Sequence, residues 1–302
     1  MNFNTGNITL VTLYGYFEDN HSQNPRHIQI PVDPQVQGEL KGMLTDTVTR
    51  LGLPAIEPNM QSFAPAEKYG SEEPLKISLA TPYLQGLASV VALRNLPSDA
   101  NALTQVSELD YYYAIFTDDQ NRHLYAFRRA SQFKGVTRSK LAFINGGMLT
   151  LLTSQVFRLD IDFDYIVTNQ DVYILRPSGF EYTTNVGEQI LQASAANAQS
   201  IAVSVNYLDV TSISAYASTH KKSARLLAAI KGRDDLDQID RDLLVQACQS
   251  YGISVLNPTN GQLTPDTGHE YDFLCILDRR AYTAILIPNQ PEKYEAASRV
   301  QK

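Results

Sequence analysis

The order of apolar and polar residues predicts strands and a helix in the first part of the chain. Residues 7–16 are rich in β-branched and aromatic side chains and predict a strand, and residues 27–32 predict a second, shorter one. From residue 34 to residue 53, apolar side chains recur every three or four positions, which is typical of an amphipathic helix. Gly52 and Pro54 mark its end.

Two antiparallel hairpins are predicted in the middle of the chain. The first joins residues 111–116 to residues 123–129 across a polar turn. The second joins residues 157–167 to residues 172–175. Residues 109–183 are therefore expected to form an antiparallel sheet.

The pattern becomes helical after this sheet. Apolar residues at helical spacing predict helices at residues 188–201, 223–231 and 239–251, followed by a short apolar segment at residues 271–277. Asp237 is expected to cap the third of these helices.

Strands followed by helices indicate an α+β fold rather than an alternating parallel sheet. We expect a smaller N-terminal α/β region, residues 1–105, and a larger domain, residues 109–302. The larger domain would be a mainly antiparallel sheet with C-terminal helices packed on it, divided into the sheet 109–183, helices 187–251 and a C-terminal segment 270–302.

Composition indicates a globular protein of a reducing compartment. Of 302 residues, 43% are apolar and 19% charged, a balance that suits a folded chain rather than a disordered one. The two cysteines, Cys248 and Cys275, lie in apolar stretches and do not suggest a disulfide framework. No histidine is spaced with cysteine or carboxylate as in a zinc site. We therefore expect no cofactor and no metal.

Signatures of common enzymes and of membrane insertion are missing from the sequence. It contains no P-loop, no dinucleotide-binding glycine pattern and no nucleophile elbow. No apolar run reaches the roughly 18 residues that a membrane-spanning helix needs, and the N-terminus lacks the pattern of a signal peptide. A cytoplasmic protein without catalytic activity is the expectation.

An acidic cluster at the start of the second hairpin offers the strongest argument for an enzyme. If residues 157–164 form a strand, Asp160, Asp162 and Asp164 share one face, with solvent or basic neighbours. The opposite, buried face would consist of Phe157, Leu159, Ile161 and Phe163.

Five carboxylates near this cluster define the alternative of a metal-dependent nuclease, namely Asp160, Asp162, Asp164, Asp171 and Glu181. A restriction-type nuclease requires a lysine on the following strand, and residues 171–175 contain none. That difference weakens the hypothesis of catalysis.

Basic residues are concentrated in two windows of an otherwise acidic chain. The formal net charge is −7, yet residues 120–159 and residues 210–233 contain no Asp or Glu. These windows hold 12 of the 25 basic residues, so the rest of the chain has 13 basic against 32 acidic residues. Such polarisation favours an anionic partner. The candidate DNA-binding residues are Arg128, Arg129, Lys134, Arg138, Lys140, Lys221, Lys222 and Arg225.

Lys221 and Lys222 lie just before a predicted helix, where positive charge opposes the helix dipole by about 0.3–1 kcal/mol per residue. Contact with phosphates would explain that placement. Since Arg128 and Arg129 are adjacent on a strand, only one of the two is expected to reach the DNA-binding surface.

Several short segments combine apolar residues with acidic or basic ones in a distinctive way. They are Tyr125-Ala126-Phe127-Arg128-Arg129, the stretch from Phe157 to Ile166, Val172-Tyr173-Ile174-Leu175, Gly179-Phe180-Glu181 and the C-terminal Glu292-Lys293-Tyr294-Glu295-Ala296. These segments resemble the KwaB family, the soluble component of the Kiwa anti-phage defence system. The resemblance covers roughly residues 109–300.

The resemblance implies a bacterial antiviral protein that acts at the inner face of the cell membrane. Its implied partners are a KwaA-like multi-pass membrane protein, DNA bound largely without sequence specificity, and a second copy in a homodimer. It would restrain phage DNA replication and transcription, and no small-molecule substrate is expected. Two other functions stay open, the nuclease described above and a scaffold without DNA affinity.

Overall fold

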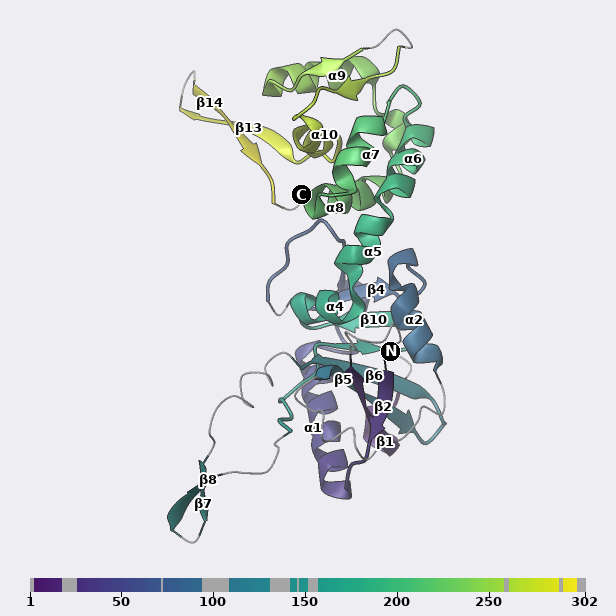
Figure 1. Cartoon of the computed structure of the whole chain (residues 1–302), viewed down its shortest axis with the longest axis vertical. Coiled ribbons are helices and arrows are strands. Elements are labelled where there is room, and N and C mark those ends of the chain that lie inside the picture. The colour runs from purple at the N-terminus through teal and green to yellow at the C-terminus, as the bar shows by residue number, and fades with distance from the viewer. Residues whose placement is uncertain are drawn as a thin grey trace. The chain divides into compact units, whose positions relative to one another are not determined.

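The structure is a computed structural model that describes residues 3–17, 26–71, 73–93, 109–130, 142–145, 147–151, 157–257, 261–287 and 290–297. It is α+β, as predicted from the sequence. The chain forms two compact units (Figure 1). The sheet unit comprises Met1–Ser62 and Tyr69–Thr184, and the helical unit comprises Phe63–Lys68 and Asn185–Lys302.

An eight-stranded sheet forms the centre of the sheet unit, with the strand order β2-β1-β5-β6-β9-β10-β4-β3. Neighbouring strands are antiparallel except for the parallel pair β3 and β4. The strands are β1 (Ile8–Phe17), β2 (Arg26–Ile30), β3 (Gln61–Ser62), β4 (Leu75–Ser78), β5 (Leu109–Asp118), β6 (His123–Arg129), β9 (Tyr165–Val167) and β10 (Asp171–Ile174).

Helix α1 (Pro34–Arg50) packs on one face of this sheet. Asp33 caps the helix by accepting a hydrogen bond from the Val36 amide at 2.8 Å, and Pro34 occupies the first turn, where its missing N–H costs nothing. Leu40 and Leu44 of α1 are fully buried in one apolar cluster with side chains of the central strands. Burial of this helix face is what holds α1 to the sheet.

The opposite face of the sheet carries a ladder of stacked aromatic rings across four strands. Tyr14, Tyr113, Phe127 and Tyr165 lie directly opposite one another in the register of β1, β5, β6 and β9. Successive ring centroids are 5.2, 5.0 and 4.8 Å apart. Phe180, from α4 (Pro177–Thr184), packs edge-on against the last ring at 5.2 Å. Such cross-strand pairs fix the register of the sheet.

The remaining described elements of the sheet unit are short. They are α2 (Gln85–Ala92), the two-stranded sheet of β7 (Ala142–Asn145) and β8 (Met148–Leu151), and the 3₁₀ turns η1 (Thr5–Asn7), η2 (Glu57–Asn59) and η3 (Pro82–Leu84). Tyr125 donates a hydrogen bond of 2.8 Å to the carbonyl of Val91, which attaches α2 to β6.

The helical unit has its own apolar core. Its helix α8 packs against α5, α6, α7 and α10. The elements are α5 (Val186–Gln192), α6 (Ser194–Ser204), α7 (Thr211–Ala217), α8 (Lys221–Lys231), η5 (Leu236–Gln238), α9 (Arg241–Tyr251) and α10 (Glu270–Leu277), with the strand pairs β11 (Val255–Leu256) with β12 (Thr264–Pro265) and β13 (Ala281–Ile287) with β14 (Gln290–Glu295).

A six-residue segment from the first third of the chain belongs to the helical unit. Buried Arg280 pairs with Glu67 at 2.8 Å, and Arg225 donates to the carbonyl of Pro65 at 2.8 Å. The helical unit is therefore completed by Phe63–Lys68, a segment more than a hundred residues earlier in the chain than the rest of that unit.

The division of the chain differs from the one expected at residue 105. Strand β1 is hydrogen-bonded to β5 along its length, so a boundary between them would cut the central sheet. The N-terminal strands and α1 build the same unit as residues 109–184, and residues 185–302 cluster separately with Phe63–Lys68.

The first hairpin and the helix at residues 34–53 are confirmed, but several other elements differ. The helix predicted at residues 188–201 is interrupted at Ala193, between α5 and α6. Asp240, not Asp237, caps α9, because its carboxylate accepts from the amides of Asp242 and Leu243 at 2.9 Å each. The C-terminal segment 270–302 contains the strands β13 and β14.

The aromatic ladder makes a testable contribution to stability. Phe127 is fully buried between Tyr113 and Tyr165, so Phe127→Ala should lower the free energy of unfolding by about 3–5 kcal/mol. Chemical denaturation followed by circular dichroism would measure the loss. Phe127→Leu should cost less, since it retains most of the apolar volume but loses the ring, and a Phe127→Leu variant as stable as the parent protein would contradict a role for ring stacking.

Candidate functional site

The acidic segment Asp160–Asp164 is a bent loop that leads into β9, not the strand predicted from its alternation. Only Tyr165–Val167 of the predicted strand 157–167 has strand pairing. The Phe163 amide donates to the hydroxyl of Thr47 on α1 at 2.8 Å, and the Asp164 amide donates to the Phe127 carbonyl at 2.8 Å. These two bonds hold the loop between α1 and the end of β6.

The predicted division into a buried apolar face and an exposed acidic face is wrong. Phe163 is buried, but Phe157 and Leu159 are only half-buried and Ile161 is 71% exposed. Asp162 and Asp164 are instead 0% and 2% exposed. The expectation of basic neighbours for the carboxylates is correct, and these neighbours are the physical reason for the bend.

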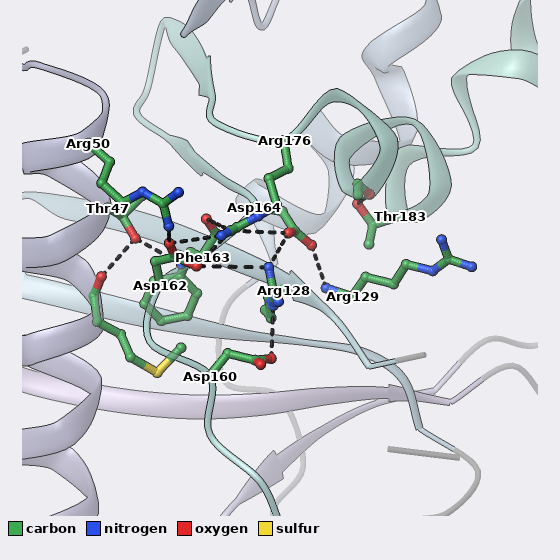
Figure 2. A network of polar contacts seen from close by, with 12 residues as sticks. Thr47, Arg50, Arg128, Arg129, Asp160, Asp162, Phe163, Asp164, Arg176 and Thr183 are labelled. Atoms are coloured by element: carbon green, nitrogen blue, oxygen red, sulfur yellow. Dashed lines mark hydrogen bonds and ion pairs between the residues drawn. The ribbon is translucent and has the colours of Figure 1, made fainter. Parts of the chain in front are cut away.

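Arg128 connects two of the three carboxylates. Its Nε donates to Asp160 at 2.9 Å, and one terminal nitrogen donates to Asp164 at 2.5 Å (Figure 2). Asp164 also accepts from the backbone amide of Arg129 at 2.8 Å. Charge-assisted bonds of this kind are about twice as strong as neutral ones, and two of them come from an arginine that is only 8% exposed.

Arg176 and Arg50 bind the remaining carboxylate, that of Asp162. Arg176 follows β10 and makes a two-pronged contact with Asp162, at 2.6 and 2.9 Å. Arg50, at the end of α1, donates to the same carboxylate (Figure 2). Three guanidinium groups from three separate parts of the sheet unit thus form hydrogen bonds with the three carboxylates, and the exposed Arg158 lies farther out, 3.9 Å from Asp160.

The pKa values of the two buried carboxyl groups, Asp162 and Asp164, shift in opposite directions. Burial disfavours the charged form of Asp162, but Arg176, Arg50 and Arg128 outweigh it and lower the pKa of that carboxyl. Burial raises the pKa of Asp164, although Arg128 and the Arg129 amide act against this. Burial alone would lower the pKa of Arg128, and Asp164 and Asp160 reverse that and raise it.

Gly179 of α4 leaves the space that Asp164 occupies. A Cβ atom at position 179 would lie 2.3 Å from the Asp164 carboxyl carbon, a distance that real contacts do not allow. The Asp164 carbonyl accepts the amides of Leu175 and Arg176 at 2.9 Å each, which brings the start of α4 close to the loop. The glycine is required here by close approach, not by an unusual backbone angle.

The five carboxylates of the nuclease alternative are not gathered into one cluster. Asp160, Asp162 and Asp164 bind arginines, whereas Asp171 pairs with Lys76 at 3.3 Å and Glu181 lies on α4. Within the part of the chain that the structure describes, no three His, Cys, Asp or Glu residues could hold a metal ion. The guanidinium groups take the positions where a cation would be needed.

The candidate DNA-binding residues of the sheet unit have different surroundings. Arg128 was expected on a DNA-binding surface, but it is buried and forms ion pairs with Asp160 and Asp164. Arg129, on the opposite face of β6, lies over the ring of Tyr182 at 3.7 Å and is partly exposed. Figure 2 shows its guanidinium directed away from the acidic cluster. Lys134, Arg138 and Lys140 lie outside the described residues.

The candidates of the helical unit lie in the first two turns of α8. Lys221 and Lys222 are exposed, and Lys221 pairs with Glu188 of α5. Arg225 is half-buried and binds the carbonyl of Pro65. The helix begins after His220, whose side chain does not cap it, and the first turn contains no acidic residue.

Folding brings acidic residues to windows that contain none in the linear sequence. Arg122 pairs with Asp118 at 2.7 Å, and Arg233 pairs with Asp235 at 2.7 Å. Together with Arg128 and Lys221, these residues account for part of the apparent positive excess. Linear charge segregation therefore overstates the positive charge that the surface of the described part presents.

Sequence reasoning missed Arg50, Arg176 and Thr47 as members of the polar network. One signal was present, because three aspartates within five residues require cations or solvent whichever way the segment folds. Which cations supply the charge depends on tertiary structure, since Arg50 is 112 residues from Asp162 in the chain.

The network should make a large contribution to stability. Asp162→Asn keeps the shape but leaves Arg176 and Arg50 beside a neutral group, so we expect a loss of about 3 kcal/mol in the free energy of unfolding. Asp171→Asn is the matched control, because the side chain of Asp171 is partly exposed and pairs with Lys76 at 3.3 Å. It should cost less than about 1 kcal/mol. Equal losses in denaturant titrations would show that the network stabilises the fold no more than a partly exposed ion pair does.

Comparison with known proteins identifies one family. A family model described as "Kiwa protein KwaB-like" matches residues 108–286. Comparisons with curated proteins and with solved structures gave no match. Among the described residues, no helix is both long and apolar enough to span a bilayer. The family match extends over more than half of the chain, from β5 into β13, and the chain therefore belongs to the KwaB-like family, a component of Kiwa anti-phage defence.

Proposed function

We propose that this Kiwa component is a DNA-binding effector without catalytic activity. It binds DNA largely without sequence specificity and restrains phage replication and transcription. Two observations support DNA binding: the polarised charge of the chain, and the exposed basic turn at the start of α8. The second observation is the one that carries the proposal.

The start of α8 combines several features that suit a phosphate group. The first amides of a helix have no acceptor within the helix and carry the positive end of its dipole. The side chain of His220 does not occupy them, because it turns back onto α7 and stacks on Tyr216 at 3.8 Å. Exposed Lys222 adds a positive charge at the same place, and exposed Lys221, which pairs with Glu188, is a second cation beside it. Together these donors favour an anion.

Contacts of this kind recognise the backbone and not the bases. Helix amides and lysines bind phosphate oxygens, which are the same for every sequence. Arg129 is a second candidate contact, since its guanidinium rests on Tyr182 and is not paired with a carboxylate within the described part of the chain. Lys134, Arg138 and Lys140 remain candidates from the sequence alone. Arg128 is no longer one.

For the acidic cluster we propose a structural role. Asp160, Asp162 and Asp164 each bind at least one arginine, and the two-pronged contact of Arg176 uses both oxygens of Asp162. A metal ion at this place would have to displace these guanidinium groups. The nuclease alternative is therefore less well supported than a binding function.

Partner and location are also proposals. Family membership supports a cytoplasmic protein that forms a homodimer and is recruited to the inner face of the membrane by a KwaA-like multi-pass protein. No residue of the chain is assigned to either interface.

DNA binding should depend strongly on salt. In gel-shift titrations, the plot of log affinity against log salt should become less steep by about 1.8 in the double variant Lys221→Gln/Lys222→Gln if each lysine neutralises one phosphate. Affinity should fall by a similar factor for duplexes of unrelated sequence. The control is Lys68→Gln, an exposed lysine outside both basic windows, which should change neither the slope nor the affinity.

Three other outcomes would change the assignment. An unchanged slope in the double variant would remove α8 from the DNA-binding surface, and Arg129→Gln would then test the sheet unit. No shift of DNA at low salt would favour a scaffold without DNA affinity. Cutting of DNA with Mg²⁺ or Mn²⁺ would favour the nuclease.

Recruitment to membranes should require the partner and not the DNA-binding lysines. When the chain is co-produced with its KwaA-like partner, it should sediment with membranes, and the Lys221→Gln/Lys222→Gln variant should do so equally. Without the partner, it should remain in the supernatant, and light scattering of that purified material should give twice the mass of one chain. Sedimentation without the partner, or a monomer at micromolar concentration, would contradict this part of the proposal.

A further inference from the structure

A cavity of about 240 Å³ lies in the helical unit, at the place where α10 meets the hairpin of β13 and β14. Its apolar part consists of Ile253, Ile276 and the buried side of Cys275, with the ring of Tyr251 beside them. Figure 1 shows the hairpin next to α10. The cavity is large enough for a small ring or a short aliphatic chain.

Two carboxylates face this apolar space, Asp272 on α10 and Glu295 on β14. One oxygen of Glu295 accepts a hydrogen bond of 2.6 Å from Tyr271, which fixes the position of the group. Asp272 is exposed and has no ion pair within the described part of the chain. The cavity thus combines an apolar surface with negative charge that is only partly compensated.

The protonation of Cys275 reports the same electrostatic environment. Burial raises the pKa of its thiol to about 12, and the negative charges of Glu295 and Asp272 contribute to that increase. The thiol therefore stays neutral at physiological pH. It lines the cavity as an apolar group and not as a nucleophile.

One wall of the cavity already binds a cation, the ammonium group of Lys293. Its ammonium lies 5.3 Å from the centre of the Tyr251 ring and donates to the carbonyl of Ser250. An aromatic face and a carbonyl thus hold a primary ammonium within the protein itself. Lys293 supplies one positive charge against the two carboxylates, so one negative charge remains.

We propose that this cavity binds an organic cation, an ammonium or guanidinium group carried on an apolar body. The charged group would lie near Asp272 and Glu295, and the body would contact Ile253 and Ile276. A free amine and the side chain of a lysine or arginine from a partner protein present the same chemistry. The proposal involves different elements from the start of α8 and does not depend on DNA binding.

Titration calorimetry with probes of opposite charge tests the proposal. 2-Phenylethylammonium and 3-phenylpropionate have the same ring on a short chain, and the cation should bind at least tenfold more tightly. Acetyl-lysine amide and acetyl-arginine amide represent the side chain of a partner protein. Preference for these amides would assign the cavity to a protein partner, and preference for the free amine would assign it to a small molecule. Either result supports a cation site.

Charge-removing variants locate the binding. Asp272→Asn should weaken the cation about tenfold, and Glu295→Gln should do the same while keeping an acceptor for Tyr271. Asp242→Asn is the control, since Asp242 is 92% exposed and lies outside the cavity. Asp272 is exposed and makes no ion pair among the described residues, so its variant should unfold at the temperature of the parent protein. Equal affinity for the two probes, no saturable binding in the millimolar range, or affinity unchanged by Asp272→Asn would overturn the proposal.

Discussion

Burial of charge at the end of the central sheet is the constraint on which the sheet unit depends. An ionised carboxylate that leaves water must be paired and hydrogen-bonded, or it destabilises the fold by several kcal/mol. Asp162 and Asp164 meet this requirement only because Arg50, Arg128 and Arg176 reach them from α1, β6 and the segment after β10. Three segments that are far apart in sequence must therefore be in place together. The same requirement explains the bent path of residues 157–164 and the glycine at position 179.

The network also changes what the basic residues of the chain can do. A stretch of forty residues without Asp or Glu predicts a positive surface when it is considered alone. In the folded chain, Arg128 faces inward and is neutralised, whereas its neighbour Arg129 lies on the other face over Tyr182. Charge available to a partner is decided by this alternation and by acids that approach from outside the stretch. Arginine in particular serves internal pairing well, because its planar group bonds two carboxylates at once.

Periodicity predicted the elements whose local preferences agree with their packing. The hairpin of β5 and β6 and the amphipathic helix α1 belong to this group. It failed where a tertiary contact overrides the local pattern. Asp160–Asp164 alternates like a strand, but pairing with arginines outweighs the preference for extended structure. The division into units was also beyond the reach of a linear pattern, since Phe63–Lys68 joins the helical unit through contacts of Arg225 and Arg280.

The region matched by the family model and the two folded units have different boundaries. The network of aspartates and arginines depends on a residue outside the matched region. The match begins at residue 108 and contains Arg128, the three aspartates and Arg176. Arg50, which completes the pairing of Asp162, lies before it on α1. Strand β1, which pairs with β5 along its length, also lies before it. The residues that carry the family resemblance are thus not a self-sufficient folding unit. They need an N-terminal part that covers one face of the sheet, extends its edge and supplies one cation, and these are tasks that many different sequences can perform. A segment under so general a constraint can diverge in sequence while its fold persists, whereas the aspartates, their arginines and Gly179 have almost no freedom to change one at a time.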